Sequence, residues 1–190
     1  MEFIRTEIPD VVIIEPKVFG DERGYFMESY RKDKLEAFLG FPVAFCQDNE
    51  SRSKKGVLRG LHYQLPPHAQ TKLVRVIRGR VLDVAVDIRR GSPTFGNHVA
   101  VELSGENKRQ LFVPRGFAHA FVVLEDDTVF AYKVDSYYAP ECDRGIAFDD
   151  PEIGIDWPLS REELLLSEKD TRQPKLSEAE LFEYGVNYYG

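Results

Sequence analysis

The stretch KLVRVIRGRVLDVAVDI, residues 72–88, decides the fold class. On both sides of Gly79, apolar side chains alternate with polar or small ones, as in half-buried β-strands. A glycine between two such runs is typical of a tight turn, so we expect residues 72–77 and 81–88 to pair as a hairpin. Further apolar runs with turns between them cover residues 99–103, 111–113, 120–123 and 129–134. Many short strands with frequent turns predict a β-sandwich or a β-barrel.

Length and composition predict a single globular domain over residues 1–190. Hydrophobic residues make up 43% of the chain and charged residues 30%, which is enough apolar material for a core. No apolar run approaches the roughly 20 residues that span a membrane, and no signal peptide is visible at the first residues. Two cysteines, Cys46 and Cys142, are too few for a disulfide framework. We therefore expect a cytoplasmic protein with no membrane partner.

The net charge of −7 argues against a nucleic-acid partner, because such proteins are usually basic. The charge is distributed unevenly along the chain. Residues 52–115 hold 13 basic and four acidic residues, whereas the remainder holds 12 basic and 28 acidic ones. This basic block indicates either an ordinary solvated surface or a pocket that attracts an anionic small molecule, such as a phosphate ester.

Helices are expected to be few and peripheral. Apolar residues at 35, 38 and 39 share one helical face, and Gly40 follows as a stop signal. Two Ser-x-x-Glu capping boxes, at residues 160–163 and 177–180, predict short helices that flank the β core. The apolar segment 11–15 predicts an N-terminal strand, which pairs within the domain or across a dimer because a bare apolar edge invites aggregation.

Two segments place titratable residues where a core strand needs none. Arg59 and His62 lie between glycines and apolar residues in the segment 56–64, and these glycines permit a bulge or a close backbone approach. Pro114-x-Gly116-x-x-His119 matches the second motif of cupin barrels. The first cupin motif needs a His-x-His pair, but this chain has His62-Tyr63-Gln64. Because a metal site needs more ligands than two histidines, we expect no metal and a function based on acid–base chemistry.

The chain resembles the dTDP-4-dehydrorhamnose 3,5-epimerases nearly from end to end. Several separate motifs carry the resemblance in order, namely residues 19–28, 47–49, 56–64, 70–75, 83–89, 92–96, 116–119 and 167–170. The resemblance implies a mainly β, cupin-like jelly-roll barrel with short flanking helices. It also implies a homodimer with an exchanged N-terminal strand, no cofactor, and a dTDP-4-keto-6-deoxyhexose substrate that is inverted at C3 and C5.

Protons at C3 and C5 are acidic because both carbons lie next to the C4 ketone, so the reaction needs a base, an oxyanion partner and an acid on the opposite face. The resemblance makes His62 the base, Lys72 the oxyanion partner and Tyr132 the acid. A carboxylate would orient His62. Asp170 is the family's usual candidate, and Asp83 is the alternative because it interrupts an apolar strand.

The resemblance also implies a set of residues that bind substrate. Arg23, Arg59, His119 and Lys169 would serve the diphosphate and its surroundings, since guanidinium groups suit phosphate oxygens. Glu28, Gln47, Asp48 and Asn49 would contact the nucleoside and the sugar. Members of the family often carry Glu where this chain has Asp143, so the reach there is one methylene shorter, and Glu141 is a nearby substitute.

Three rival functions remain open at this stage. The first is an epimerase of the same family that inverts only C3 or only C5. The second is a cupin that binds a sugar nucleotide without catalysis. The third is a metal-dependent cupin oxygenase, which Gln64 disfavours because it stands where a histidine ligand is needed.

Overall fold

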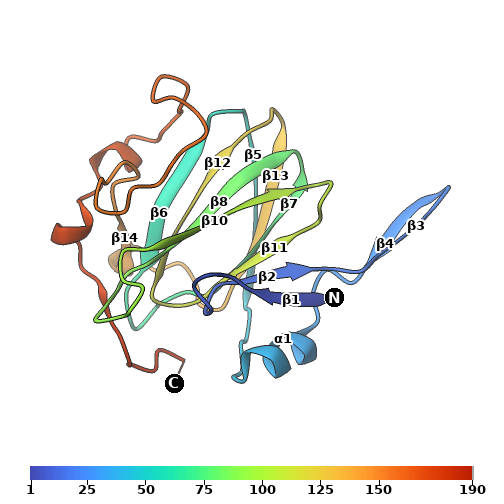
Figure 1. Cartoon of the computed structure of the whole chain (residues 1–190), viewed down its shortest axis with the longest axis horizontal. Helices are drawn as coiled ribbons and strands as arrows, with labels where there is room; N and C mark the ends of the chain where they lie inside the picture. The colour runs from blue at the N-terminus through green and yellow to red at the C-terminus, as the bar shows by residue number, and fades with distance from the viewer. Residues whose placement is uncertain (190) are drawn as a thin grey trace.

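Two antiparallel β-sheets pack face to face in the computed structural model, which describes residues 1–189 (Figure 1). The six-stranded sheet has the order β1 (Glu2–Arg5), β2 (Val12–Glu15), β11 (Gln110–Val113), β7 (Lys72–Arg78), β13 (Thr128–Val134) and β5 (Gln47–Ser53). The five-stranded sheet has the order β10 (His98–Ser104), β8 (Arg80–Asp87), β12 (Phe117–Val123), β6 (Leu58–Gln64) and β14 (Asp143–Gly145). The mainly β, cupin-like fold is confirmed, although the two sheets form a sandwich and are not hydrogen-bonded into a closed barrel.

The core lies between the sheets, and the alternating residues of β7 and β8 fill it. Val74 and Val76 from one sheet pack in the same cluster as Val81 and Ala85 from the other, and all four are buried. Burying a valine side chain stabilises the fold by roughly 1.5–3 kcal/mol relative to leaving it exposed. The period-two pattern therefore supplies one inward face to each sheet.

The expected hairpin of residues 72–77 with 81–88 is wrong. β7 pairs with β11 and β13, whereas β8 pairs with β10 and β12, so the turn carries the chain from one sheet to the other. Gly79 is required at this crossing because its φ is +80° and a Cβ there would lie 2.2 Å from Thr128 Oγ1. A tight glycine turn is compatible with a hairpin and with a crossing, and tertiary packing decides between them.

Short elements cover the edges of the sandwich. Helix α1 (Lys32–Leu39) ends at Gly40, as the sequence predicts. The remaining pieces are the hairpin β3 (Val18–Asp21) with β4 (Gly24–Met27), the pair β9 (Arg89–Arg90) with β15 (Phe182–Glu183), and the single 3₁₀ turns η1 (Pro140–Cys142), η2 (Asp170–Arg172) and η3 (Leu176–Glu178).

The two C-terminal helices expected from capping boxes do not form as α-helices. At 160–163, the Ser160 backbone and hydroxyl both donate to Glu163 Oε2, yet the segment is only a turn. The backbone of Leu165 instead exchanges hydrogen bonds with Gly56 and Leu58, which a continuing helix would forbid. At 177–180 the chain makes only η3, because Phe182 already pairs beside β9. Local capping signals are thus overridden by pairing with the sheet edge.

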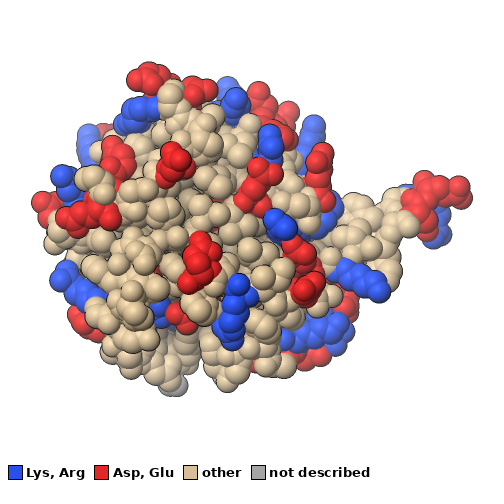
Figure 2. All heavy atoms as spheres, in the orientation of Figure 1, with Lys and Arg blue, Asp and Glu red and all other residues tan. Residues whose placement is uncertain are grey.

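The N-terminal segment behaves in two ways. β2 pairs with β1 and β11 of its own chain, so both edges of the strand of residues 12–15 are hydrogen-bonded within the domain. The β3–β4 hairpin instead projects away from the body (Figures 1 and 2), with Phe19, Tyr25 and Phe26 at 54%, 56% and 68% exposure. Within the described residues, no helix is long and apolar enough to cross a membrane.

Candidate functional site

Titratable side chains gather between the two sheets, where a plain core would be apolar. β13 turns Phe130 and Tyr132 inward: Phe130 belongs to the central cluster of buried residues, and the partly buried Tyr132 packs against that cluster. The ring of Phe130 lies 6.3 Å from the ring of His119, which pairs across the β12–β6 ladder with His62. Lys72 completes the group, because its Nζ lies 3.5 Å from the His62 carbonyl oxygen. These side chains therefore share one interior site.

A break in the β6 ladder explains how Arg59 and His62 serve the same side. Residues three apart would face opposite ways on a regular strand. The β12–β6 register shifts between His119 and Phe121, opposite Gly60. Gly60 has a φ of +136°, and a Cβ there would lie 2.3 Å from the Cβ of Ala120. The bulge or close approach expected from the glycines of this segment is confirmed.

Asp170, and not Asp83, orients His62. The Nε2 atom of His62 lies 2.5 Å from Asp170 Oδ1, and the aspartate side chain is only 3% exposed. Ser167 Oγ donates to the other carboxylate oxygen at 2.8 Å. Burial raises the pKa of Asp170, but the hydrogen bonds from His62 and Ser167 outweigh burial and leave that pKa below its usual value. An ionised Asp170 holds the Nε2 proton, which leaves Nδ1 of His62 to accept another.

Asp83 instead holds His119. The Nε2 atom of His119 lies 2.9 and 3.0 Å from the two oxygens of Asp83, and both side chains are buried. Burial lowers the pKa of His119 despite the attraction of Asp83, so the imidazole is neutral at physiological pH. The same burial raises the pKa of Asp83. The structure thus places His119 inside the sandwich beside His62.

Lys72 opens β7 with its ammonium group inside the site. Burial lowers its pKa to about 8, against the attraction of Asp83 and Asp143. Tyr132 stands on the neighbouring strand, where burial raises the pKa of its phenol and the nearby Arg59 opposes that shift. The phenol is therefore protonated at neutral pH, as a proton donor must be.

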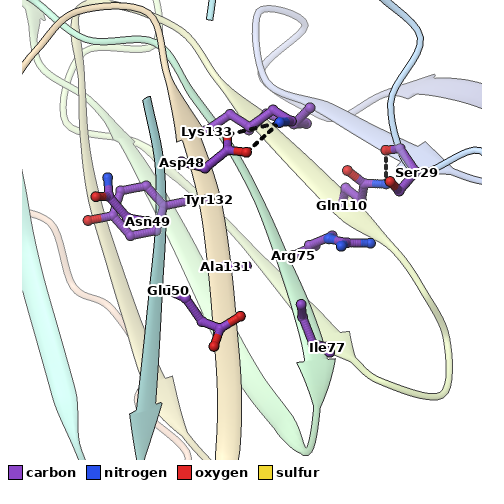
Figure 3. Close-up of a pocket in the computed structure, with 11 residues that line it drawn as sticks. Ser29, Asp48, Asn49, Glu50, Arg75, Ile77, Gln110, Ala131, Tyr132 and Lys133 are labelled. Atoms are coloured by element: carbon purple, nitrogen blue, oxygen red, sulfur yellow. Dashed lines mark hydrogen bonds and ion pairs between the residues drawn. The ribbon is translucent and has the colours of Figure 1, made fainter. Parts of the chain in front are cut away.

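The expected substrate-binding residues of β5 point in two directions. Gln47 and Asn49 are joined by a hydrogen bond of 2.8 Å, and Asn49 lies on the same side of the sheet as Tyr132 (Figure 3). Asp48 faces the other side and accepts hydrogen bonds from Lys133 Nζ at 2.8 and 3.0 Å. There it lines a hollow of about 410 Å³ with Arg75, and Tyr132 also contributes to the lining (Figure 3).

Asp143 forms a cluster at the edge of β14. Its carboxylate pairs with Lys169 and accepts a hydrogen bond of 3.1 Å from the Tyr138 hydroxyl. Tyr138 is 60% exposed, and the hydrogen bond to Asp143 raises its pKa. Sequence reasoning missed Tyr138, although two adjacent tyrosines after a strand were its visible signal. Glu141 is exposed in η1 and lies close enough to Tyr138 to raise the pKa of that phenol, so its role as a substitute for Asp143 stays a prediction.

Arg23 and Glu28 lie outside this site in a single chain. Arg23 sits at the hairpin tip with its side chain 84% exposed and pairs with Asp21. Glu28 pairs with Arg31 and Lys34 beside α1. The exposure of the hairpin means that its side chains are free to meet another molecule.

No three His, Cys, Asp or Glu residues between residues 1 and 189 are arranged to hold a metal ion. Gln64 stands where the first cupin motif has its second histidine. Its amide donates to the carbonyl oxygens of His68 and Tyr137 and accepts from the Ala139 backbone. Gln64 therefore ties three loop segments together.

The comparisons with known proteins agree with the motifs. A model of the family described as dTDP-4-dehydrorhamnose 3,5-epimerase matches residues 5–178. A relative of that name from Shigella flexneri is 57% identical over 182 residues, which are 96% of this chain and 99% of the relative.

Two solved structures show the same fold. The dTDP-6-deoxy-D-glucose-3,5-epimerase of Legionella pneumophila, in complex with dTDP-4-keto-L-rhamnose, is 52% identical with a TM-score of 0.93, covering 97% of this chain and 99% of that one. A 3'-monoepimerase from Streptomyces bikiniensis, in complex with dTDP-quinovose, is 35% identical with a TM-score of 0.89, covering 95% and 93%. The resemblance carried by the motifs is confirmed, and this chain belongs to the dTDP-4-dehydrorhamnose 3,5-epimerase family.

Proposed function

We propose that this protein inverts C3 and C5 of dTDP-4-dehydro-6-deoxy-D-glucose to give dTDP-4-dehydro-L-rhamnose. The observation that carries the proposal is the His62–Asp170 pair, which shares the interior of the sandwich with Lys72 and Tyr132. This set contains a base with its orienting carboxylate, a cation and a protonated phenol. Relatives that are 55–57% identical over nearly the full chain are named for this activity.

The proton transfers follow from the positions of these groups. Nδ1 of His62 takes the proton from the carbon next to the ketone, and the electron pair of the C–H bond moves into an enolate whose charge rests on O4. Asp170 stabilises the imidazolium that forms. Tyr132 then gives its phenolic proton to the opposite face of the carbon, which completes the inversion. Solvent exchange restores both groups before the second carbon reacts.

Lys72 is assigned to the oxygen of the developing enolate. The ammonium of Lys72 supplies a positive charge in a partly desolvated site, where such a charge acts more strongly than in water. His119 is neutral, and Asp83 holds its Nε2 proton, so its Nδ1 has only a lone pair and is assigned to accept a hydrogen bond from a substrate hydroxyl. Electrostatic stabilisation of this kind needs no metal and no cofactor.

Binding of the dTDP group is assigned to the residues around the mouth of the site. Arg59 and Lys169 supply positive charge for the diphosphate, and Gln47 and Asn49 supply hydrogen-bonding amides for the sugar and nucleoside. The exposed ring of Tyr138 adds a flat apolar face next to Asp143. These assignments favour the second interpretation of the basic block, because Arg59 and Lys72 both come from it.

Incubation of the protein with dTDP-4-keto-6-deoxy-D-glucose in heavy water tests the function. We expect deuterium at C3 and at C5 of the product by NMR, because each carbon passes through an enolate. Deuterium at one carbon alone would make the protein a monoepimerase, like the similar protein from Streptomyces bikiniensis. Tight binding with no deuterium would make it a sugar-nucleotide binder. Both outcomes would contradict the proposal.

The pH dependence of turnover tests the role of Lys72. Because the pKa of Lys72 lies at about 8, the ammonium is present below that pH and is lost above it. We expect kcat to fall as the pH rises through about 8, measured with saturating substrate. In Lys72→Arg, whose guanidinium keeps its proton throughout this range, the residual kcat should not fall there. An identical fall in the arginine variant would assign the titration to another group.

We further propose that the protein is a cytoplasmic homodimer in which the β3–β4 hairpin reaches the partner's site. The hairpin exposes the aromatic rings of Phe19, Tyr25 and Phe26, and the side chain of Arg23 at its tip is 84% exposed. Exposed apolar patches of this kind are typical of interaction surfaces. The free cysteines Cys46 and Cys142 fit a reducing compartment.

Mixing two inactive variants tests the dimer. Arg23→Ala and His62→Ala should each be nearly inactive, whereas their mixed dimers contain one site with both native residues. We expect activity to return on mixing, after subunit exchange, and light scattering should show a dimer mass. Phe26→Glu should lower that mass to a monomer, while Phe95→Glu, which changes an exposed phenylalanine elsewhere, should not. No regained activity would place Arg23 outside the partner's site.

A further inference from the structure

The segment after residue 178 lies outside the matched family model. Its residue Tyr189 contacts Thr71 and Arg115, which flank the strands β7 and β11 of the site. The family model covers residues 5–178. Beyond it, β15 pairs in parallel with β9, and Tyr184 places its ring 5.3 Å from the guanidinium carbon of Arg89. The tail then brings Tyr189 against Phe41, with ring centroids 4.5 Å apart. The described part of the tail is therefore held against the body at Tyr184 and at Tyr189.

Tyr189 meets a hydrogen-bond network at the ends of three neighbouring strands. Its phenol oxygen accepts from Thr71 Oγ1 at 3.0 Å and from the Arg115 backbone N–H at 3.2 Å. Asp135 accepts from the Thr71 backbone N–H at 2.6 Å and from Arg115 Nε at 3.2 Å. Thr71 is fully buried, and the Asp135 side chain is 3% exposed. Arg115 also donates to the Tyr188 carbonyl and lies over the Tyr189 ring.

The network is placed immediately next to a catalytic strand position. Lys72 pairs with Val113 of β11 and with Val134 of β13. Thr71 precedes Lys72, Arg115 follows Val113 by two residues, and Asp135 follows Val134. The network of Thr71, Arg115, Asp135 and Tyr189 therefore lies just beyond the paired residues of β7, β11 and β13. Lys72 is the first residue of β7, and its side chain enters the site from that position. A shift of Thr71 would move the Lys72 ammonium with it, because the two are joined by one peptide unit.

We propose that Tyr189 is a positioning residue for Lys72: its phenol oxygen, together with Asp135, ties the ends of β7, β11 and β13 and sets where the Lys72 ammonium stands relative to His62. The inference rests on the proposed function, since it assigns Lys72 to the reaction. Misplacement of a catalytic group by about 1 Å can cost as much as 10²-fold in rate, so a small relaxation of Thr71 has a measurable effect.

The test compares Tyr189→Phe with Tyr184→Phe, which removes a hydroxyl from the same tail but neither of the bonds to Thr71 and Arg115. We expect Tyr189→Phe to lower kcat about threefold to tenfold, the size of the effect of one neutral hydrogen bond, with KM within twofold of the native value. Tyr184→Phe should keep native kcat. Circular dichroism and the thermal midpoint report whether each variant is folded at the assay temperature.

Thr71 supplies a second, independent pair of variants. Thr71→Val should lower kcat as Tyr189→Phe does, and Thr71→Ser, which keeps the hydroxyl, should restore most of it. The double variant Tyr189→Phe with Thr71→Val should be no slower than the slower single variant, because both remove the same bond. A purely structural role predicts a lower thermal midpoint with native kcat per folded molecule, and that result would overturn the inference. If the native protein incorporated no deuterium into the substrate, the proposed function would be wrong, and the inference that rests on it would also fail.

Discussion

Replacing His62 with alanine is expected to abolish exchange of the C3 and C5 hydrogens with solvent while leaving nucleotide binding nearly intact. The imidazole lies 2.5 Å from a buried carboxylate, which fixes its orientation and leaves Nδ1 for the substrate. Removing a general base costs about 10²–10⁴-fold in rate. Deuterium wash-in followed by NMR measures the loss, and calorimetric titration with dTDP measures the binding.

Asp170→Asn is the matched variant for His62. The amide keeps the size of the side chain but cannot accept the Nε2 proton as a carboxylate does, so the reactive tautomer of His62 is no longer favoured. We expect a rate between those of the native protein and His62→Ala. Asp83→Asn disturbs His119 instead and should leave the exchange step less affected. Native-like exchange in His62→Ala would remove His62 from the role of base.

Replacing Tyr132 with phenylalanine is expected to slow inversion about 10²-fold while slowing hydrogen exchange much less. The reason is the separation of roles between the two sides of the substrate. His62 still removes the proton and can return it to the same face, so exchange continues without inversion. The variant keeps the ring that packs with Phe130 inside the sandwich, so the fold is preserved.

The measurement compares two rates in one sample. Deuterium appearing in unchanged substrate reports exchange, and the product signal reports inversion. An equal loss of both rates in Tyr132→Phe would show that the phenol is needed before the enolate forms, which contradicts its assignment as the opposite-face acid. Tyr184→Phe serves as the control, because the Tyr184 ring lies over Arg89 outside the acid–base site.

The β class of the fold followed from the alternation in residues 72–88, since a period of two leaves little choice of secondary structure. Strand partners did not follow from it. The turn at Gly79 predicted a hairpin, whereas the structure uses the same turn to cross between sheets. Hairpin and crossing bury the same apolar face, so only long-range pairing with β11, β12 and β13 distinguishes them.

The candidate site divides in the same way. The resemblance pointed to His62 and Tyr132, and the structure places both at the interior of the sandwich. The sequence analysis grouped Gln47, Asp48 and Asn49 as contacts to one ligand. In the strand β5, successive side chains face opposite sides of the sheet, so Asp48 points away from Gln47 and Asn49. The choice between Asp170 and Asp83 needed the path of a chain of more than one hundred residues between His62 and its carboxylate. Sequence patterns predict local geometry well, but they predict contacts between residues far apart in the chain only through resemblance to a known family.

The crossing at Gly79 also bears on how the chain is made. Neither β7 nor β8 has a partner among the strands that precede it, because the partners are β10 through β13. On the ribosome, β5 to β8 therefore emerge before any of their partner strands, and β5 stays unpaired until β13, which ends at residue 134, has left the exit tunnel. Contacts so distant along the chain favour slow folding and leave nascent chains open to aggregation, so we expect this protein to depend on chaperones during synthesis more than a helical bundle of equal length.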